Sequence, residues 1–202
     1  MFSKLLLPFL AVASAVSDES QCNDLAKYRT DYVAQNFDDV KAGGFFYENA
    51  YQDLAQVGSS CGYYSKNATG TGDVIEQFGF TYANPNHMML KYTTDKEAPQ
   101  AAVYTKKIDK GDDGFGPPIS SVVVDVTLSA DGTTYESMTE YACFTVGSIT
   151  YNEIRIGSRS PSMSDEELAE KEKVLADQGI QYRELKVVDH NGCEYDINEG
   201  AH

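Results

Sequence analysis

The residues in this 202-residue chain that could do chemistry are its histidines, cysteines and carboxylates. The histidines are isolated, and their spacing fits no metal site: His87, His190 and His202. The sequence has no G-x-S-x-G, no H-E-x-x-H, no phosphate-binding glycine loop and no dinucleotide fingerprint. An acidic loop around Asp109 and Asp113 lacks the closing glutamate of a calcium loop. We therefore expect no catalytic residues, no metal and no cofactor.

The four cysteines are widely spaced, with no C-x-x-C pair: Cys22, Cys61, Cys143 and Cys193. In an oxidising compartment four such cysteines predict two disulfides, and the sequence alone allows three pairings. A cysteine left unpaired would be a candidate nucleophile.

The first residues predict secretion. Lys4 precedes an apolar run over residues 5–12, and Ala13-Ser14-Ala15 fits the small-X-small cleavage pattern of a signal peptide. We expect a signal peptide over residues 1–15 and a single domain over 16–202. No other segment is apolar enough to form a transmembrane segment. Asn67-Ala68-Thr69 is an acceptor triplet for N-glycosylation.

The net charge is -15 at pH 7. Nucleic acids and anionic membrane surfaces attract basic proteins, so this acidity argues against both as partners.

Short segments with a period of two dominate the chain between residues 44 and 159. In the clearest, Val122, Val124, Val126 and Leu128 alternate with polar residues. This pattern is typical of a strand with one buried face, and about eight such segments occur. Earlier, a short helix is possible over residues 25–34, and residues 108–118 are expected to form a loop. One long helix is predicted over about 165–178, where Ser164 and Glu167 form a capping box. The order predicts an all-β sandwich or barrel with one helix packed outside.

Aromatic residues are abundant, with 14 tyrosines and 9 phenylalanines but no tryptophan. They could fill a core, or line the cavity of an eight-stranded barrel that holds one small ligand. Apolar alternation favours these residues as cavity-lining ligand contacts: Tyr63, Phe78, Phe80, Tyr82, Met88, Leu90, Tyr92, Tyr104, Val122, Val124 and Tyr141. A slip of one residue would reverse every assignment.

Two separated stretches resemble the lipocalin family. "GGFFYENA" (residues 43–50) resembles the first lipocalin motif, Gly-X-Trp-Tyr-Glu, with Gly44 at the glycine and Phe46 at the tryptophan position. "SRSP" (residues 158–161), followed by the predicted helix, resembles the end of the last barrel strand, with Arg159 at the family's arginine. Among lipocalins the chain is most similar in style to apolipoprotein D and the bacterial lipocalins.

The resemblance implies an eight-stranded antiparallel up-and-down β-barrel with one C-terminal α-helix packed outside. It implies a barrel floor formed by Gly44, Phe46 and Arg159, in which the guanidinium covers a phenylalanine instead of a tryptophan. It also implies the disulfides Cys22–Cys143 and Cys61–Cys193.

The expected function is that of a secreted protein that binds and transports a small hydrophobic molecule, such as a lipid, sterol, fatty acid, retinoid, bilin or carotenoid. One alternative is an enzyme on the same barrel, an isomerase or de-epoxidase, which would use a free cysteine or inward-pointing carboxylates such as Glu48 and Glu76. Another is a protein-binding module that captures a protein partner or receptor through its loops, with the acidic loop at residues 109–113 as the candidate contact.

Overall fold

The computed structural model describes residues 22–70, 72–109, 115–146 and 149–195. The predicted signal peptide lies outside these residues. The chain forms nine strands and four helical segments in the described part. The strands are β1 (Gly44–Gln52), β2 (Ser60–Ala68), β3 (Val74–Thr81), β4 (Pro85–Thr93), β5 (Val103–Ile108), β6 (Phe115–Leu128), β7 (Tyr135–Val146), β8 (Ile149–Ser158) and β9 (Lys186–Val187). The helical segments are η2 (Leu25–Tyr28), α1 (Asp31–Asn36), η3 (Leu54–Gln56) and α2 (Asp165–Asp177).

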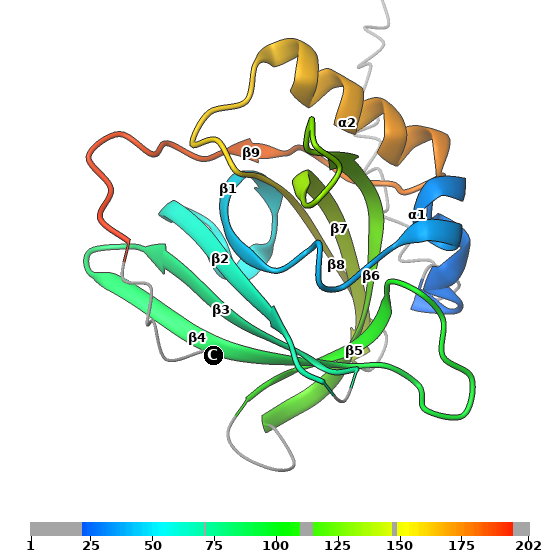
Figure 1. Ribbon diagram of the computed structural model, residues 1–202. Coiled ribbons are helices and arrows are strands. Elements are labelled where there is room, and N and C mark those ends of the chain that lie inside the picture. The colour runs from blue at the N-terminus through cyan, green and yellow to red at the C-terminus, as the bar shows by residue number, and fades with distance from the viewer. Residues whose placement is uncertain (1–21, 71, 110–114, 147–148, 196–202) are drawn as a thin grey trace, which may run out of the picture.

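Strands β1 to β8 form a closed antiparallel barrel (Figure 1). Each strand pairs with the next in the chain, and β1 closes the barrel because it pairs with both β2 and β8. Closure gives every strand two neighbours, so the main barrel has no free edge. The short strand β9 pairs with Ala50 and Tyr51 of β1, beyond the part of β1 that pairs with β2. The predicted eight-stranded up-and-down barrel is therefore confirmed.

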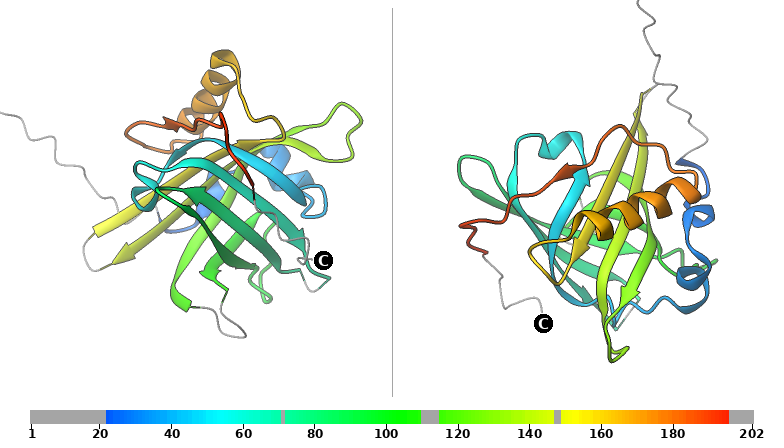
Figure 2. Two further views of the ribbon diagram at one scale, coloured as in Figure 1. Left: turned by 90° about the vertical axis from the view of Figure 1, so that its left-hand side faces the viewer. Right: turned by 90° about the horizontal axis from the view of Figure 1, so that it is seen from above.

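Helix α2 packs against the outside of the barrel (Figure 2). Ser164 and Glu167 form the predicted capping box at its N-terminus. Leu175 is fully buried between the helix and the outer face of the barrel. Lys171 binds Asp125 of β6 at 2.9 Å, which adds a polar contact to the same interface. The predicted helix differs from the observed one by a single residue at its C-terminus.

The predicted helix over 25–34 is divided into η2 and α1. Thr30 lies between them in an extended conformation, donates its backbone N–H to Val124 and accepts a hydrogen bond from Val33 as the cap of α1. Attachment to β6 thus interrupts the helix. The predicted loop over 108–118 is also shorter than expected, because β6 already begins at Phe115.

Two apolar cores flank the barrel wall. The inner core lies inside the barrel and includes Phe46, Phe78 and Tyr92. The outer core lies between the barrel, the N-terminal segment and α2, and includes Val122 and Leu175. Many strand segments are therefore buried on both faces.

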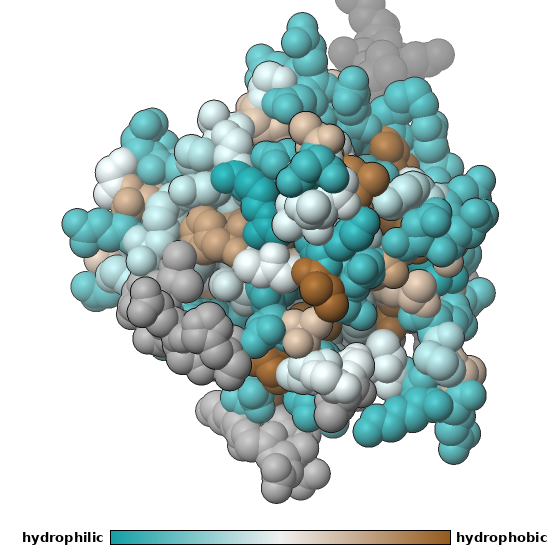
Figure 3. Space-filling model, viewed as in Figure 1, coloured by the Kyte–Doolittle hydropathy of each residue, from teal (hydrophilic) through white to brown (hydrophobic). Residues whose placement is uncertain are grey.

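Two disulfides attach the chain ends to the barrel: Cys22–Cys143 and Cys61–Cys193. These are the pairs that the lipocalin resemblance implies, so no cysteine remains free. The face shown in Figure 3 is mostly hydrophilic with scattered apolar residues. Across the described ranges, we find no helix long and apolar enough to cross a membrane.

Candidate functional site in the barrel interior

Four oppositely charged side chains meet inside the barrel. Lys66 of β2, Glu76 of β3, Glu140 of β7 and Arg155 of β8 form ion pairs with one another. Three strands lie between β3 and β7 in either direction around the barrel. Side chains from such distant strands can meet only across the interior. We call these four residues the interior charge network.

Arg155 is the centre of this network. Its two terminal nitrogens donate to the two carboxylate oxygens of Glu76, at 2.8 and 2.9 Å. Its Nε donates to Glu140 at 2.8 Å, and the hydroxyl of Tyr92 accepts a further bond at 3.0 Å. Such forked contacts are the strongest that a guanidinium makes with carboxylates. Lys66 then bridges the same two carboxylates, at 3.2 Å from Glu76 and 2.5 Å from Glu140.

Aromatic rings surround the two cations. The Arg155 guanidinium lies 4.1 Å from the ring centre of Tyr64, and the Lys66 ammonium lies 4.4 Å from that of Tyr92. Tyr64 in turn stacks on Phe46. The interior thus combines paired charges with flat apolar surface, and cation–π contacts strengthen when they are shielded from water.

The network holds Glu140 in its charged form. Burial alone would raise the pKa of this carboxyl, but the positive charges of Arg155 and Lys66 outweigh it and lower the pKa to about 2.

Glu48 of β1 is the exception among the interior carboxylates. It is fully buried, and its Oε1 accepts a hydrogen bond from the amide of Gln56 at 3.3 Å. Its Oε2 has no hydrogen-bond partner within the described parts of the chain. Burial raises the pKa of Glu48 to about 8, and the positive charge of Arg155 opposes that rise only in part.

A glycine makes room for the Glu48 carboxylate. A Cβ on Gly62 of β2 would overlap Oε2 and would crowd the Cβ and Cδ of Glu48 at 3.1 and 3.2 Å. Any larger residue at position 62 would therefore push the carboxylate away. The missing side chain lets Oε2 occupy this position beside β2.

A short lid covers Glu48 at the end of the barrel where β1 ends and β2 begins. Gln56 belongs to η3 in this β1–β2 connection and is almost fully buried. The hydroxyl of Tyr51 donates to the Gln56 carbonyl at 2.7 Å, and that of Tyr82 donates to the Ala55 carbonyl. Asp53 contacts the same Gln56 amide at 3.3 Å, so a second carboxylate lies next to the lid.

The opposite end of the barrel is sealed. The Arg159 guanidinium lies over the Phe46 ring at 3.7 Å from its centre. It donates hydrogen bonds to the carbonyls of Gly43, Phe45 and Tyr135. A Cβ on residue 44 would lie 3.1 Å from the same guanidinium, and Gly44 has a positive φ of 91°. Glycine therefore fits this position both sterically and conformationally.

Six of the eleven residues assigned to the cavity lining from sequence lie in or against the inner core: Phe78, Phe80, Met88, Leu90, Tyr92 and Tyr104. Their alternation on β3, β4 and β5 places them around the interior charge network. They remain proposed ligand contacts.

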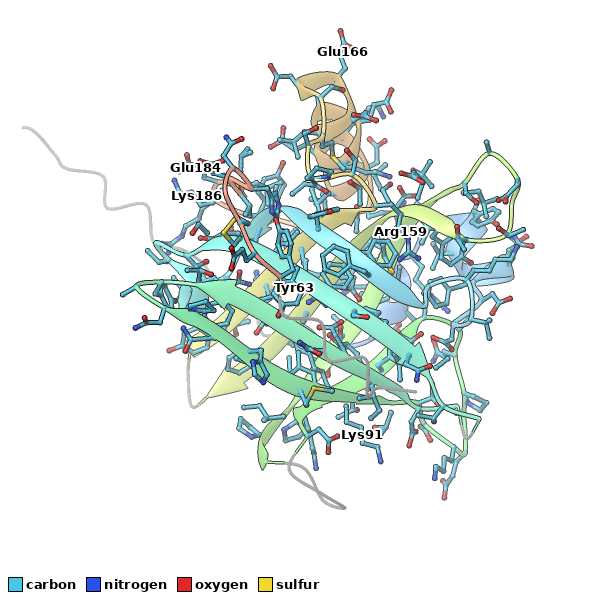
Figure 4. All side chains as sticks on the ribbon, turned by 60° about the vertical axis from the view of Figure 1, so that its left-hand side comes forward. Tyr63, Lys91, Arg159, Glu166, Glu184 and Lys186 are labelled. Carbon is cyan, nitrogen blue, oxygen red and sulfur yellow. A yellow bond between two sulfur atoms is a disulfide. The ribbon has the colours of Figure 1, made fainter. Side chains whose placement is uncertain are left out.

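The other five side chains lie elsewhere, which corrects their assignment to the interior. Val122, Val124 and Tyr141 belong to the outer core under α2 and the N-terminal segment. Tyr63 lies on the outer side of β2, stacked on Phe45 and in edge contact with Tyr195 of the C-terminal tail (Figure 4). Tyr82 is 44% exposed at the lid. Alternation cannot distinguish the two faces of these strands, because helices and terminal segments bury the outer face as well.

Four residues of the site were not predicted from the sequence: Lys66, Glu140, Arg155 and Gln56. Lys66 and Glu140 occupy strand positions of the same parity as inner-core residues, since Lys66 follows Tyr64, and Glu140 follows Met138, by two residues. A charged residue in phase with buried apolar ones is the signal that could have identified Lys66 and Glu140. Arg155 lies between Ile154 and Ile156 of the outer core and has no such neighbour on β8. Gln56 lies in a loop and has no such signal.

Two other predicted features are the acidic loop of the protein-binding alternative and the glycosylation acceptor Asn67. The acidic loop at 109–113 lies outside the described residues except for Asp109. Asn67 lies in β2 and is half-buried. In the described part of the chain, no group of three or more His, Cys, Asp or Glu side chains is arranged to hold a metal ion.

No protein-family model and no curated protein sequence matches the chain. Solved structures with similar architecture include the siderocalin Ex-FABP, with a TM-score of 0.55 and 13% identity, covering 78% of this chain and 97% of the other. Insecticyanin from the tobacco hornworm Manduca sexta gives 0.59 and 14%, covering 77% and 82%. Apocrustacyanin C2 gives 0.58 and 12%, covering 76% and 79%. Together with the closed barrel, the outer helix and the arginine-covered floor, these similarities show that the chain has the lipocalin fold.

Proposed function

We propose that this protein is a secreted binder and carrier of a small lipophilic molecule, which enters the barrel past the lid at Leu54–Gln56. The observation that carries this proposal is the interior charge network surrounded by aromatic rings. A core that served only for stability would be cheaper to build from apolar residues, because charges lose their hydration when buried. The combination suits a ligand with an apolar body and a polar group.

The inner-core residues give the apolar body its contacts. Phe78 and Phe80 lie on β3, and Met88 and Leu90 lie on the neighbouring β4, where Met88 is opposite Phe78. Removing apolar ligand surface from water here contributes roughly 25 cal/mol per Å². The side chains that fill the interior in the absence of a ligand include long flexible ones, such as Lys66 and Gln56, which can change rotamer when a ligand enters.

The comparisons support the proposal without naming a ligand. The siderocalin Ex-FABP is described as functioning through dual ligand specificities. The predicted signal peptide and the two disulfides support secretion. A closer relationship to apolipoprotein D and the bacterial lipocalins remains part of the proposal. The enzyme alternative loses its nucleophile, since all four cysteines are paired.

Native mass spectrometry of the purified, disulfide-bonded protein tests this function. We expect a one-to-one mass increment with at least one member of a panel of fatty acids, sterols, retinoids, tetrapyrroles and alkylamines. Absence of any increment from correctly folded protein would refute the proposal and would favour a protein-binding module.

A matched pair of variants on β4 locates the ligand. Met88→Trp enlarges a side chain that packs against the inner core, so it should reduce the increment. Lys91→Trp is the control, because Lys91 has the opposite parity on the same strand and its side chain points away from the barrel (Figure 4). This variant should leave the ligand mass increment unchanged. Equal effects of both variants would place the ligand outside the barrel.

A further inference from the structure

We propose that the ligand carries a positively charged amine and that Glu48 is its counter-ion. This inference rests on the proposed function and adds the chemical class of the ligand. It follows from three properties of the interior: its charge balance, the unpartnered oxygen of Glu48, and the polar groups along the entrance.

The ion pairs of the described interior are balanced. Lys66 and Arg155 balance Glu76 and Glu140, and Lys106 of β5 balances Glu153 of β8. Glu48 is a further carboxylate and makes no ion pair with Lys66, Arg155 or Lys106, each of which is engaged by other carboxylates. A ligand with a single positive charge would complete the balance.

The geometry of Glu48 points to a hydrogen-bond donor as the missing partner. A buried acceptor without a donor is costly, and native proteins rarely tolerate one without a functional reason. Oε2 lies against Gly62, where the absent side chain keeps β2 from displacing it. An ammonium has three donors and compact charge, so it can serve Oε2 while its apolar chain contacts the inner core.

The charged and titratable groups that face Glu48 come from every element around it. Arg155 lies on β8, Glu76 on β3 and Tyr64 on β2, and Asp53 lies beside the lid. Burial, together with the charge of nearby Glu153, raises the pKa of Asp53. An entering cation therefore passes one carboxylate at the lid before it reaches the next.

The same arrangement disfavours an anionic ligand. A carboxylate or phosphate group would need Arg155, Lys66 or Lys106; the first two each contact two carboxylates, and Lys106 is paired with Glu153. Binding would break these contacts and would bring a further negative charge near Glu48. Like charges in a poorly hydrated site repel strongly.

Three ligands that differ only in their polar group test the inference: decylamine, decanol and decanoic acid. We expect calorimetric titration at pH 9, where Glu48 is mostly ionised, to show decylamine bound about tenfold more tightly than decanol, as a hydrogen bond between charged groups implies. Decanoic acid should bind more weakly than either. Equal or tighter binding of decanol or decanoic acid would overturn the amine inference and leave the proposed function intact. Absence of binding by all three would overturn the inference. If the wider lipophile panel also failed to bind, the proposed function would be refuted.

Proton release gives a second, independent reading. Because the pKa of free Glu48 is raised to about 8, this carboxyl is mostly protonated at pH 7. Pairing with an ammonium requires the carboxylate, so decylamine should release about 0.9 proton per molecule bound, and decanol none. Titrations in buffers of different ionisation enthalpy measure this number. A value near zero for decylamine would contradict the pairing.

Two variants assign the effect to Glu48. Glu48→Gln should abolish proton release and lower decylamine affinity to the level of decanol, a much larger loss than any loss for decanol. Glu166→Gln removes the same charge from the exposed side of α2 (Figure 4) and should change none of these. If Glu48→Gln weakened both ligands equally, or if Glu166→Gln had the same effect, Glu48 would not be the counter-ion.

Discussion

Glu48 should make the protein less stable as the pH rises through the neutral range. Its pKa is raised to about 8 in the folded chain, against an ordinary value of 4.5. Between these two pH values the folded state keeps a proton that the unfolded state has lost. The resulting stabilisation is fully present below pH 4.5 and is lost as the pH rises through about 8.

The size of the effect follows from the difference between the two pKa values. Each pH unit across that interval changes the free energy of unfolding by 1.36 kcal/mol, so the total is on the order of 5 kcal/mol. This is comparable to the whole stability of many domains. Glu140 does not interfere, because its lowered pKa affects stability only below pH 4.5.

Urea denaturation at pH 5, 6, 7 and 8.5, with the disulfides intact, measures this dependence. Wild-type protein should lose stability over that range, whereas Glu48→Gln cannot titrate and should lose less by about 4 kcal/mol, the part of the total that falls between pH 5 and 8.5. Other groups, such as His190, whose burial lowers its pKa, contribute equally to both proteins. If the wild type and Glu48→Gln showed parallel pH profiles, Glu48 would not be a buried, uncompensated carboxyl.

Three further changes test the packing around the site. Gly157→Ala should destabilise the protein by about 1–3 kcal/mol and weaken ligand binding, because the added Cβ would overlap the Tyr64 ring inside the barrel. Gly79→Ala is the control, because its Cβ would overlap Tyr63 on the outer side of the barrel, and it should destabilise the protein without a specific loss of affinity. Urea denaturation measures the stability of both variants, and ligand titration measures their affinity. Arg155→Met should cost about 3–5 kcal/mol by urea denaturation, because it leaves two buried carboxylates with Lys66 as their shared cation. Arg159→Ala should cost about 2–3 kcal/mol, because three carbonyls lose their donor; an unchanged denaturation midpoint would contradict a sealing role.

The parts of the fold that the sequence made predictable are those governed by local rules or by short motifs. The cap of α2 needs only Ser164 and Glu167, and both bonds of the capping box are present. The barrel floor depends on Phe46 and Arg159, which are 113 positions apart, and only the family resemblance connects them. The disulfide pairs likewise came from the resemblance, since spacing alone left three arrangements open.

The inner face of the barrel was harder to predict, for a physical reason. Alternation reports that one face of a strand is apolar, but it does not say which side of the barrel wall that face covers. On β3 and β4 the apolar face is the inner one, whereas Val122 and Val124 of β6 pack outside under the N-terminal segment and α2. A shift of register between Val123 and Asp125 further breaks the alternation along β6.

The interior charges could not be predicted from alternation because they contradict the assumption behind it. Lys66, Glu76 and Arg155 occupy buried positions that the rule reserves for apolar side chains, and their partners come from strands far away in the chain. Only the closed topology shows that they meet. Among the described charges of the interior, Glu48 has no ionic partner, and the absent side chain of Gly62 gives it space. A network built only for stability would gain nothing from a fifth ionisable group that has no partner when it is charged. An incoming cation is the partner that gives that charge a role, and this is why the polar group of the ligand, more than its apolar body, should decide what the barrel selects.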